Sequence, residues 1–282
     1  MDLVTITCNR DFELSRLQSE SIDKFLDPCT HWVFVNERFP NKKKWREMLK
    51  PYYTKHNLKL IFPKWYEYLF TIDGFRRHAA YKLLMVNYID HDFVALDPKN
   101  FFVKPCNINE WKDIVGSGEI GWDPKWQAAS ERYAKKFNMP LVADEMLLSE
   151  TPFVYKIDLL KQLGDMNKFV KWYLADQSCE TVLYSYLANH LVKNNFVHQM
   201  KHKTYWRMDP PLSIDELYHN LHYNQNIKMV GFHRFYLLKI PEQNLKDINQ
   251  WLKVMGFKSQ ITRYKPGWFD RFVNKKILKD LI

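Results

Sequence analysis

The N-terminal part of the sequence alternates short apolar runs with a helical pattern, which restricts the chain to few folds. The runs are LVTITCN (3–9), HWVFVNE (31–37) and LKLIFP (58–63), each nearly continuous in apolar and β-branched residues, and FELSRLQSESIDKFL (12–26) has apolar residues at helical spacing. Strands that are apolar throughout are buried on both faces, as in parallel sheets covered by helices. We therefore predict an α/β fold with a mostly parallel central sheet flanked by helices, which binds ligands at the carboxyl ends of its strands.

A further helix and strand follow, and the strand ends in charged residues. Asp73 is suited to cap a helix over 74–89, and one face of that helix carries Phe75, Ala79, Leu83, Val86 and Ile89. The strand DFVALD comes next, so that Asp97 lies at its carboxyl end. Asp97 precedes a proline, and Asp-Pro commonly opens a turn. Two interpretations of Asp97 remain open at this stage, a turn residue and part of a ligand site.

The composition indicates a folded protein. With 282 residues, of which 46% are hydrophobic and 16% aromatic, the chain can bury enough apolar surface to offset the entropy of ordering. Its four cysteines lack CxxC spacing, which indicates neither a zinc site nor a disulfide framework, and we expect a reduced, cytoplasmic protein. The N-terminus has no basic region and no stretch approaches about 18 apolar residues, so we expect neither a signal peptide nor a membrane span.

The charge is strongly positive and clustered. Lys and Arg number 42 against 32 Asp and Glu, a formal charge of +10. Residues 38–64 contain nine basic residues and one acid, residues 181–208 contain no acid, and the segment from 263 onward is basic. A solvated surface explains any one stretch, whereas three together, interspersed with aromatic residues, favour nucleic acid, because lysines contact phosphates and rings stack on bases. The candidate DNA-binding residues are Lys42, Lys43, Lys44, Lys201, Lys203, Arg207, Lys275 and Lys276.

Several motifs, taken in order, resemble the GT-A glycosyltransferases. GFRRHAAYK (74–82) is similar to a helix signature Gly-Trp-x-Arg-Gln-Gln-x-x-Lys of a bacterial and phage branch, with His78 and Ala79 in place of the glutamines. LDPKN (96–100) is similar to that branch's Leu-Asp-x-Lys-Asn metal motif. TPFVYKIDLL (151–160), CETVLYSYL (179–187) and VGFHR (230–234) resemble later segments, so that the resemblance covers about residues 1–235.

The resemblance implies a donor site for a UDP-sugar and a divalent cation. The implied nucleotide-sugar contacts are Thr7, Asn9, Arg10, Arg77, Lys82, Lys99, Asn100 and His233. Asp97 and His233 are the implied ligands of Mn²⁺ or Mg²⁺, which would stabilise the charge that develops on the leaving diphosphate. Lys99 stands where many GT-A enzymes have another carboxylate, which puts the metal in question, because a lysine can contact the phosphate directly.

The acceptor side is expected on the helix that carries Glu180. Asp176 precedes Glu180 by one turn, and the two carboxylates form one edge of the helix. Glu180 is the candidate base for the acceptor hydroxyl if the reaction inverts the anomeric carbon, and a positioning residue if it retains configuration. A plain surface acid remains the alternative.

The identity of the acceptor stays open between three interpretations. The basic, aromatic-rich stretches favour DNA, and the chain resembles phage enzymes that attach sugars, such as arabinose or glucose, to hydroxymethylated bases in double-stranded DNA. A transferase acting on a polysaccharide or lipopolysaccharide is the second interpretation. A nucleic-acid binder without activity, with Lys99 marking a decayed metal site, is the third. We expect a catalytic domain over 1–240, with a nucleotide-sugar half over about 1–115 and an acceptor half over about 116–240, and a basic helical extension over 241–282.

Overall fold

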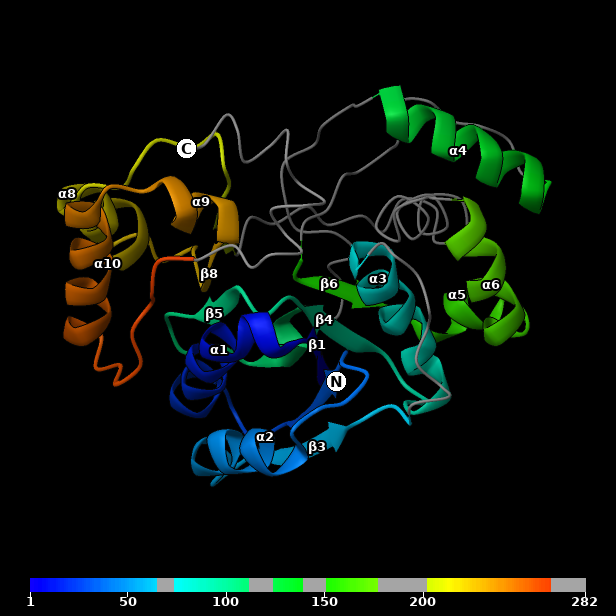
Figure 1. Cartoon of the computed structure of the whole chain (residues 1–282), viewed down its shortest axis with the longest axis horizontal. Coiled ribbons are helices and arrows are strands. Elements are labelled where there is room, and N and C mark those ends of the chain that lie inside the picture. The colour runs from blue at the N-terminus through cyan, green and yellow to red at the C-terminus, as the bar shows by residue number, and fades with distance from the viewer. Residues whose placement is uncertain (65–73, 112–123, 139–150, 177–201, 265–282) are drawn as a thin grey trace.

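The fold is built around a five-stranded sheet. The structure is a computed structural model, and it describes residues 1–64, 74–111, 124–138, 151–176 and 202–264 (Figure 1). The strand order is β3-β2-β1-β4-β6, with β1 at Asp2–Thr7, β2 at Thr30–Val35, β3 at Asn57–Ile61, β4 at Phe93–Leu96 and β6 at Phe153–Tyr155. The pairs β3-β2, β2-β1 and β1-β4 are parallel, whereas β6 is antiparallel to β4. The mostly parallel sheet that the sequence predicts is confirmed.

Helices cover both faces of this sheet, which explains the continuous apolar runs of its strands. Val4, Ile6 and Ala95 face a core that includes residues of α3 (Gly74–Leu84), α5 (Ile157–Lys161) and α6 (Met166–Asp176). Leu3 and Val94 face the opposite core, which contains residues of α1 (Phe12–Phe25). On that second side α2 (Lys42–Leu49) packs its buried tryptophan and leucine under β2. Figure 1 shows α1 and α2 on one side of the sheet and α3, α5 and α6 on the other.

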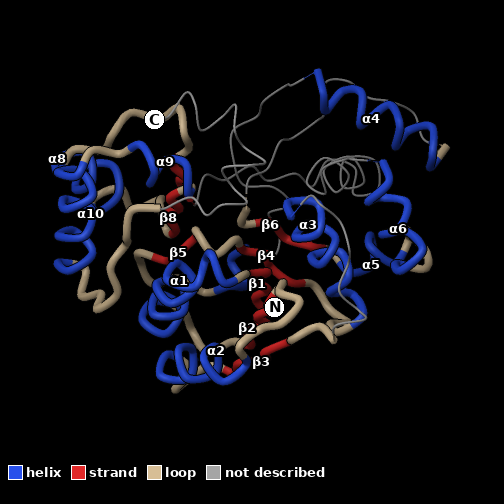
Figure 2. Tube along the Cα trace, viewed as in Figure 1, coloured by secondary structure: helices blue, strands red, loops and turns tan. Residues whose placement is uncertain are grey.

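A smaller three-stranded sheet continues the structure beyond β4. Its order is β5-β8-β7, with β5 at Asn100–Phe102, β7 at His202–Tyr205 and β8 at Met229–Phe232. Figure 2 shows β5 and β8 next to each other. β5 is antiparallel to β8, and β7 is parallel to it. Because only the three residues 97–99 separate β4 from β5, the two sheets meet directly at Asp97.

The described part of the predicted C-terminal extension belongs to the core of the smaller sheet. The amphipathic helix predicted within 241–257 is α10 (Glu242–Val254), and Leu245, Ile248, Trp251 and Leu252 are buried as expected. These residues share one apolar core with Phe101 of β5, Phe232 of β8 and Leu17 of α1. The helix is therefore integrated with the smaller sheet, whereas the second predicted C-terminal helix, after residue 264, lies outside the described residues.

The remaining elements are short helices and turns between these strands and helices, together with the helix α4. They are η1 (Asn9–Asp11), η2 (Lys50–Tyr52), η3 (Met85–Asn87), η4 (Ile108–Trp111), α4 (Pro124–Phe137), α8 (Ile214–Glu216), the π-helical turn η6 (Leu217–His222) and α9 (Arg234–Lys239). Cys8, Cys29 and Cys106, the cysteines within the described residues, form no disulfide. Among the described helices, none has the length and apolar character that a bilayer crossing requires.

A buried polar chain crosses beneath β1 and β2. The Thr5 hydroxyl donates to Gln18 Oε1 at 2.9 Å and also lies 2.9 Å from His31 Nε2. His31 Nδ1 lies 2.5 Å from the Tyr53 hydroxyl, which in turn contacts Ser19 Oγ at 3.1 Å. Since buried polar groups need partners, this series of hydrogen bonds fixes the rotamers of the side chains that form it.

The burial of His31 makes stability depend on pH. Burial lowers the pKa of His31 to about 3, with a smaller contribution from His56. The unfolded chain takes up a proton near pH 6.5 and the folded chain does not, so stability is lost as pH falls below 6.5. The unfolding free energy, measured by urea denaturation, should decrease between pH 7 and pH 5 in both the wild type and His31→Gln. The decrease should be about 2 kcal/mol smaller in His31→Gln than in the wild type. His219→Gln, at an exposed position, is the matched control, and equal losses in His31→Gln and wild type would contradict this assignment.

Candidate functional site

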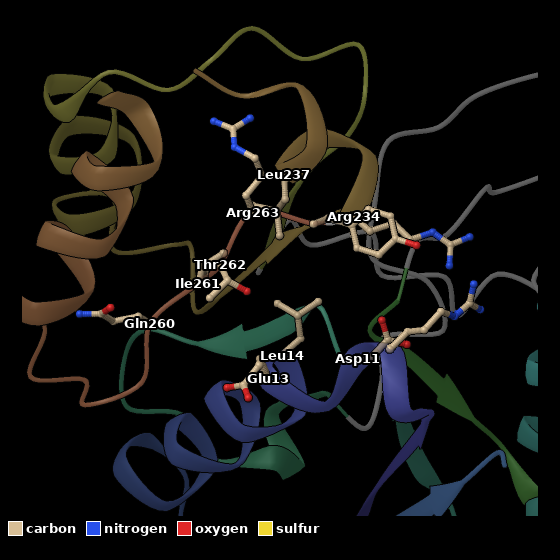
Figure 3. A pocket seen from close by; sticks show the side chains of 11 residues that line it. Asp11, Glu13, Leu14, Arg234, Leu237, Gln260, Ile261, Thr262 and Arg263 are labelled. Atoms are coloured by element: carbon tan, nitrogen blue, oxygen red, sulfur yellow. The ribbon is translucent and has the colours of Figure 1, made fainter. Parts of the chain in front are cut away.

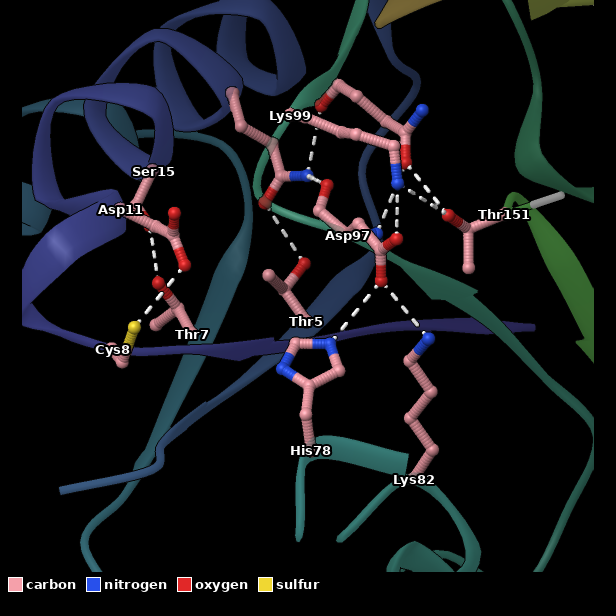
Figure 4. A network of polar contacts seen from close by, with 12 residues as sticks. Thr5, Thr7, Cys8, Asp11, Ser15, His78, Lys82, Asp97, Lys99 and Thr151 are labelled. Carbon is pink, nitrogen blue, oxygen red and sulfur yellow. Dashed lines mark hydrogen bonds and ion pairs between the residues drawn. The ribbon is translucent and has the colours of Figure 1, made fainter. Parts of the chain in front are cut away.

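The site is centred on Asp97, which follows the last residue of β4. Its Oδ1 accepts from Lys82 Nζ at 2.9 Å and lies 3.2 Å from His78 Nε2, and its Oδ2 accepts from Lys99 Nζ (Figure 4). Lys82 and His78 come from α3, one turn apart, and Lys99 comes from the turn that leads into β5. The Asp97 side chain is 22% exposed and those of Lys82 and Lys99 are 4% and 10% exposed. Two nearly buried ammonium groups thus share one carboxylate at the carboxyl edge of the sheet.

Side chains around the β4–β5 turn hold Asp97 in place. The Asp97 N–H donates to Asn100 Oδ1 at 3.1 Å, and the Asn100 N–H donates to the Asp97 carbonyl at 2.9 Å. Gln18 Nε2 donates to the carbonyls of Asp97 and Asn100, at 2.8 Å each. Thr151, which precedes β6, donates its hydroxyl proton to Asn100 Oδ1 at 3.1 Å. The turn is therefore fixed from α1, from β5 and from the segment before β6.

The electrostatic environment keeps Asp97 ionised. Burial by itself raises the pKa of this carboxyl, but Lys82, Lys99 and the hydrogen bond from His78 outweigh it, so that the pKa lies well below its usual range. The carboxylate therefore stays negative, and it holds both ammonium groups by charge-assisted hydrogen bonds.

His233 lies beside the same centre, at the end of β8. Its Nδ1 accepts from the Phe235 N–H at 3.3 Å, so the ring caps the N-terminus of α9. The rings of His233 and Trp206 lie 4.7 Å apart between centroids, and Lys99 Nζ lies 5.1 Å from the Trp206 centroid. Burial, together with the charges of Lys99 and Arg234, lowers the pKa of His233 to about 3 and keeps the ring neutral. Trp206 thus bridges His233 and the Lys99–Asp97 pair.

Arginine side chains border the edge near the end of β1. Asn9 and Arg10 are exposed there, and Asn9 Oδ1 accepts from Trp45 Nε1 of α2 at 3.2 Å. Arg77 Nε donates to Asn36 Oδ1 at 2.9 Å. A side chain added at Gly74 would place its Cβ 3.9 Å from one guanidinium nitrogen of Arg10 and 4.0 Å from one of Arg77. Both guanidinium groups therefore gather at the N-terminus of α3.

A cavity of about 510 Å³ has Arg10 among its lining residues (Figure 3). Its basic residues are Arg10, Arg234 and Arg263, and its acidic residues are Asp11 and Glu13. Figure 3 shows that the lining comes from the start of α1, from α9 and from the segment after α10. One lining residue, Arg234, directly follows His233 in the sequence.

Two residues predicted to contact the nucleotide sugar have structural roles. Thr7 is fully buried, and its hydroxyl lies 2.6 Å from Ser15 Oγ, which ties β1 to α1. Asn100 is also fully buried, and its amide oxygen supports the Asp97 turn. Both side chains are buried and hydrogen-bonded within the fold, and their contact with a nucleotide sugar stays a prediction.

The other predicted residues fall into three groups. Asp97, Lys82, Lys99 and His233 come together, with Asn9, Arg10 and Arg77 along the same edge of the sheet. Of the DNA-binding candidates, Lys42, Lys43 and Lys44 begin α2 and are exposed, whereas Lys203 and Arg207 lie partly buried at and after β7. Outside the described residues lie Glu180, Lys201, Lys275 and Lys276, and of Asp176 only the backbone is described, as the last residue of α6.

The sequence prediction overlooked four residues of this centre. They are Gln18, His78, Thr151 and Trp206, which contact Asp97, Asn100, Lys99 or His233. His78 had a usable signal, since it lies four residues before Lys82 and therefore on the same helical face. Gln18 and Trp206 had none, because only the tertiary structure brings α1 and β7 to this edge.

The donor set at Asp97 does not fit a divalent metal ion. Within the described residues, no three Asp, Glu, His or Cys side chains converge to hold a metal. Asp97, one of the two predicted ligands, has both oxygens engaged by nitrogen donors. Hard divalent cations need several oxygen ligands, and ammonium groups supply none.

Comparisons with known proteins show the fold. The galactosyltransferase LgtC, solved in complex with donor and acceptor sugar analogs, is 11% identical with a TM-score of 0.53, and the match covers 96% of this chain and 99% of that one. Mouse xyloside xylosyltransferase 1, in its apo form, is 8% identical with a TM-score of 0.45, covering 82% of this chain and 96% of that one. No model of a known protein family and no curated protein sequence matches the chain. The similarity to LgtC confirms the prediction that this chain has an α/β fold of the GT-A type.

The close packing around Asn100 provides a test of how the turn is held. A Cβ at Gly231 of β8 would lie 2.8 Å from Asn100 Nδ2 and 3.0 Å from Thr204 Oγ1. Gly231→Ala should therefore lower the unfolding free energy by about 1–3 kcal/mol, measured by urea denaturation. Gly74→Ala is the control, since its Cβ would meet atoms only at 3.9 Å and beyond. A Gly231→Ala protein as stable as the wild type would show that β8 does not constrain Asn100.

Proposed function

We propose that the chain is a glycosyltransferase that takes its sugar from a UDP-sugar. The observation that carries this proposal is the cluster of Lys82, Lys99 and His233 around Asp97, at the carboxyl edge of a parallel sheet. Ligands of such sheets bind at this edge, and two ammonium groups against one carboxylate leave a positive centre suited to a diphosphate. The GT-A fold agrees with a donor site at this edge. We propose that the enzyme acts in the cytoplasm.

The proposed chemistry is the departure of a diphosphate. The bond between the anomeric carbon and the diphosphate oxygen breaks, and its electron pair stays on that oxygen. The acceptor hydroxyl oxygen forms the new bond to the anomeric carbon and gives up its proton. Positioned cations stabilise the transition state because negative charge grows on the leaving oxygen. Lys82 and Lys99 are both held by ion pairs with Asp97, which positions their ammonium groups for this stabilisation.

We assign the nucleotide end of the donor to the arginine-bordered part of the edge. Three side chains are grouped there. Asn9 accepts a hydrogen bond from Trp45, Arg77 donates one to Asn36, and the guanidinium groups of Arg10 and Arg77 both lie near Gly74. Arginine guanidinium groups suit phosphate oxygens, and the N-terminus of α3 adds its own partial positive charge.

We further propose Glu180 as the group that receives or positions the acceptor hydroxyl, with Asp176 beside it. α6, which ends at Asp176, shares a core with α3, the helix that carries Lys82. The helix predicted to carry Glu180 follows α6 in the chain, within residues that the structure does not describe.

The acceptor we propose is a hydroxymethyl group on a base of double-stranded DNA. Lys42, Lys43 and Lys44 support this proposal, because they stand exposed at the start of α2, beside Asn9 on the same edge of the sheet. Lysines in this position can contact phosphates while a flipped base reaches the site. Lys99 lies inside an ordered charge network rather than in a decayed site, which favours an enzyme over an inactive DNA binder.

A transfer assay tests the function and the acceptor together. The protein is incubated with labelled UDP-glucose or UDP-arabinose and with hydroxymethylated DNA, plain DNA or an oligosaccharide. We expect label only in the hydroxymethylated DNA, and Lys99→Met should reduce the rate by at least about a hundredfold. Lys156→Met is the matched control, since Lys156 also pairs with a carboxylate, Asp92 at 3.0 Å, away from the edge. Label in the oligosaccharide alone would refute the DNA acceptor, and no transfer to any acceptor would refute the transferase.

The salt dependence of DNA binding tests the lysines of α2. Replacing Lys42, Lys43 and Lys44 by Gln should reduce the slope of log K against log salt by about 2 to 3, because each phosphate contact releases roughly one counterion. The control replaces three exposed lysines on other helices, Lys135, Lys246 and Lys253. If both triple variants reduce the slope equally, the effect reflects net charge and not a DNA contact at α2.

A further inference from the structure

We infer that the donor diphosphate is bound by Lys82, Lys99 and His233 directly, without a divalent cation. This inference rests on the proposed function and names how its site binds the leaving group. It departs from the metal site that the LDPKN motif led us to expect. Three features of the described residues carry it, one at Asp97, one at His233 and one at Trp206.

The first feature is that Asp97 is already occupied by cations. Oδ1 accepts from Lys82 and lies within contact of His78, and Oδ2 accepts from Lys99. A metal ion would have to displace at least one ammonium group and then remain beside both of them. Two ammonium groups and one carboxylate sum to one positive charge, which a divalent cation would increase and a diphosphate would offset. The centre is therefore built for an anion.

The second feature is the proton position on His233. The Phe235 N–H donates to Nδ1 at 3.3 Å, so the lone pair of Nδ1 is already used. Because Nδ1 accepts this hydrogen bond, it carries no proton, and the ring proton is on Nε2. A nitrogen that carries a proton has no lone pair for a metal ion. His233 therefore presents a hydrogen-bond donor, and a phosphate oxygen is the complementary partner.

The third feature is the ring that joins His233 to Lys99. The Trp206 ring lies 4.7 Å from His233 and 5.1 Å from Lys99 Nζ, which orients both groups in one cluster. Its Nε1 is buried without a hydrogen-bond partner among the described residues. The cluster thus contains three kinds of donor, ammonium, imidazole and indole, and Asp97 is its acidic member. Such a set is complementary to an acceptor-rich group like a diphosphate.

Binding of UDP to the full chain separates this inference from the proposed function. Isothermal titration with UDP is run in EDTA and again with Mn²⁺ or Mg²⁺ in excess. We expect the two dissociation constants to agree within about twofold, since no metal contributes to the complex. Binding of UDP only with the metal would overturn the inference and leave the proposed function standing. Binding in neither condition would overturn both.

Single substitutions test the assigned donors. Lys82→Met and Lys99→Met should each weaken UDP binding in EDTA by at least about tenfold, and Lys156→Met should leave it unchanged. Lys99→Arg keeps the charge and should retain most of the affinity, which guards against a loss caused by misfolding. UDP affinity that is unaffected by both Met variants would refute the assignment.

Asp97→Asn distinguishes the two roles of the carboxylate. If Asp97 only positions the lysines, its loss leaves two uncompensated ammonium groups, so the free protein should melt at a lower temperature while UDP still raises the melting temperature. If Asp97 is a metal ligand, the same variant should lose its response to UDP in the presence of Mn²⁺. A complete loss of the UDP response, with the melting transition still cooperative, would contradict the inference.

Discussion

The structure depends on one shared carboxylate, that of Asp97. It joins α3, through Lys82 and His78, to the turn between the two sheets, through Lys99. Removing one partner from a buried ion pair typically costs about 3–5 kcal/mol, because the remaining charge is left uncompensated. The same network that orders the sheet edge therefore fixes the groups proposed to bind the donor. Stability and the proposed function therefore depend on the same residues.

The two sheets explain why so many elements reach this centre. β1 and β4 end at the edge of the larger sheet, and β7 and β8 end beside it in the smaller one. Because only residues 97–99 lie between β4 and β5, residues at the ends of β7 and β8 are brought to Asp97. Gly231 allows β8 to approach Asn100 closely, since any side chain there would meet the Asn100 amide. A positive, donor-rich surface is the consequence of this topology.

Much of the fold could be predicted from the sequence, whereas the site could be predicted only in part. The strands were recognisable because burial on both faces removes the polar alternation, and α3 and α10 because their apolar residues recur at helical spacing. Asp97 and Lys99 stood out because they follow a predicted strand and match the LDPKN resemblance, which implied their role in a ligand site. Thr7 also lies at the end of a strand but turns its hydroxyl to Ser15, and no local pattern reports this choice. Gln18 and Trp206 depend on packing between distant segments, which a single sequence does not encode in any short motif.

The decisive experiment is a crystal structure of the protein with UDP and Mn²⁺, with anomalous data collected above the manganese edge. We expect diphosphate oxygens within hydrogen-bond distance of Lys82 Nζ, Lys99 Nζ and His233 Nε2, with no anomalous peak beside Asp97. A manganese peak bonded to an Asp97 oxygen and bridging to the diphosphate would contradict it.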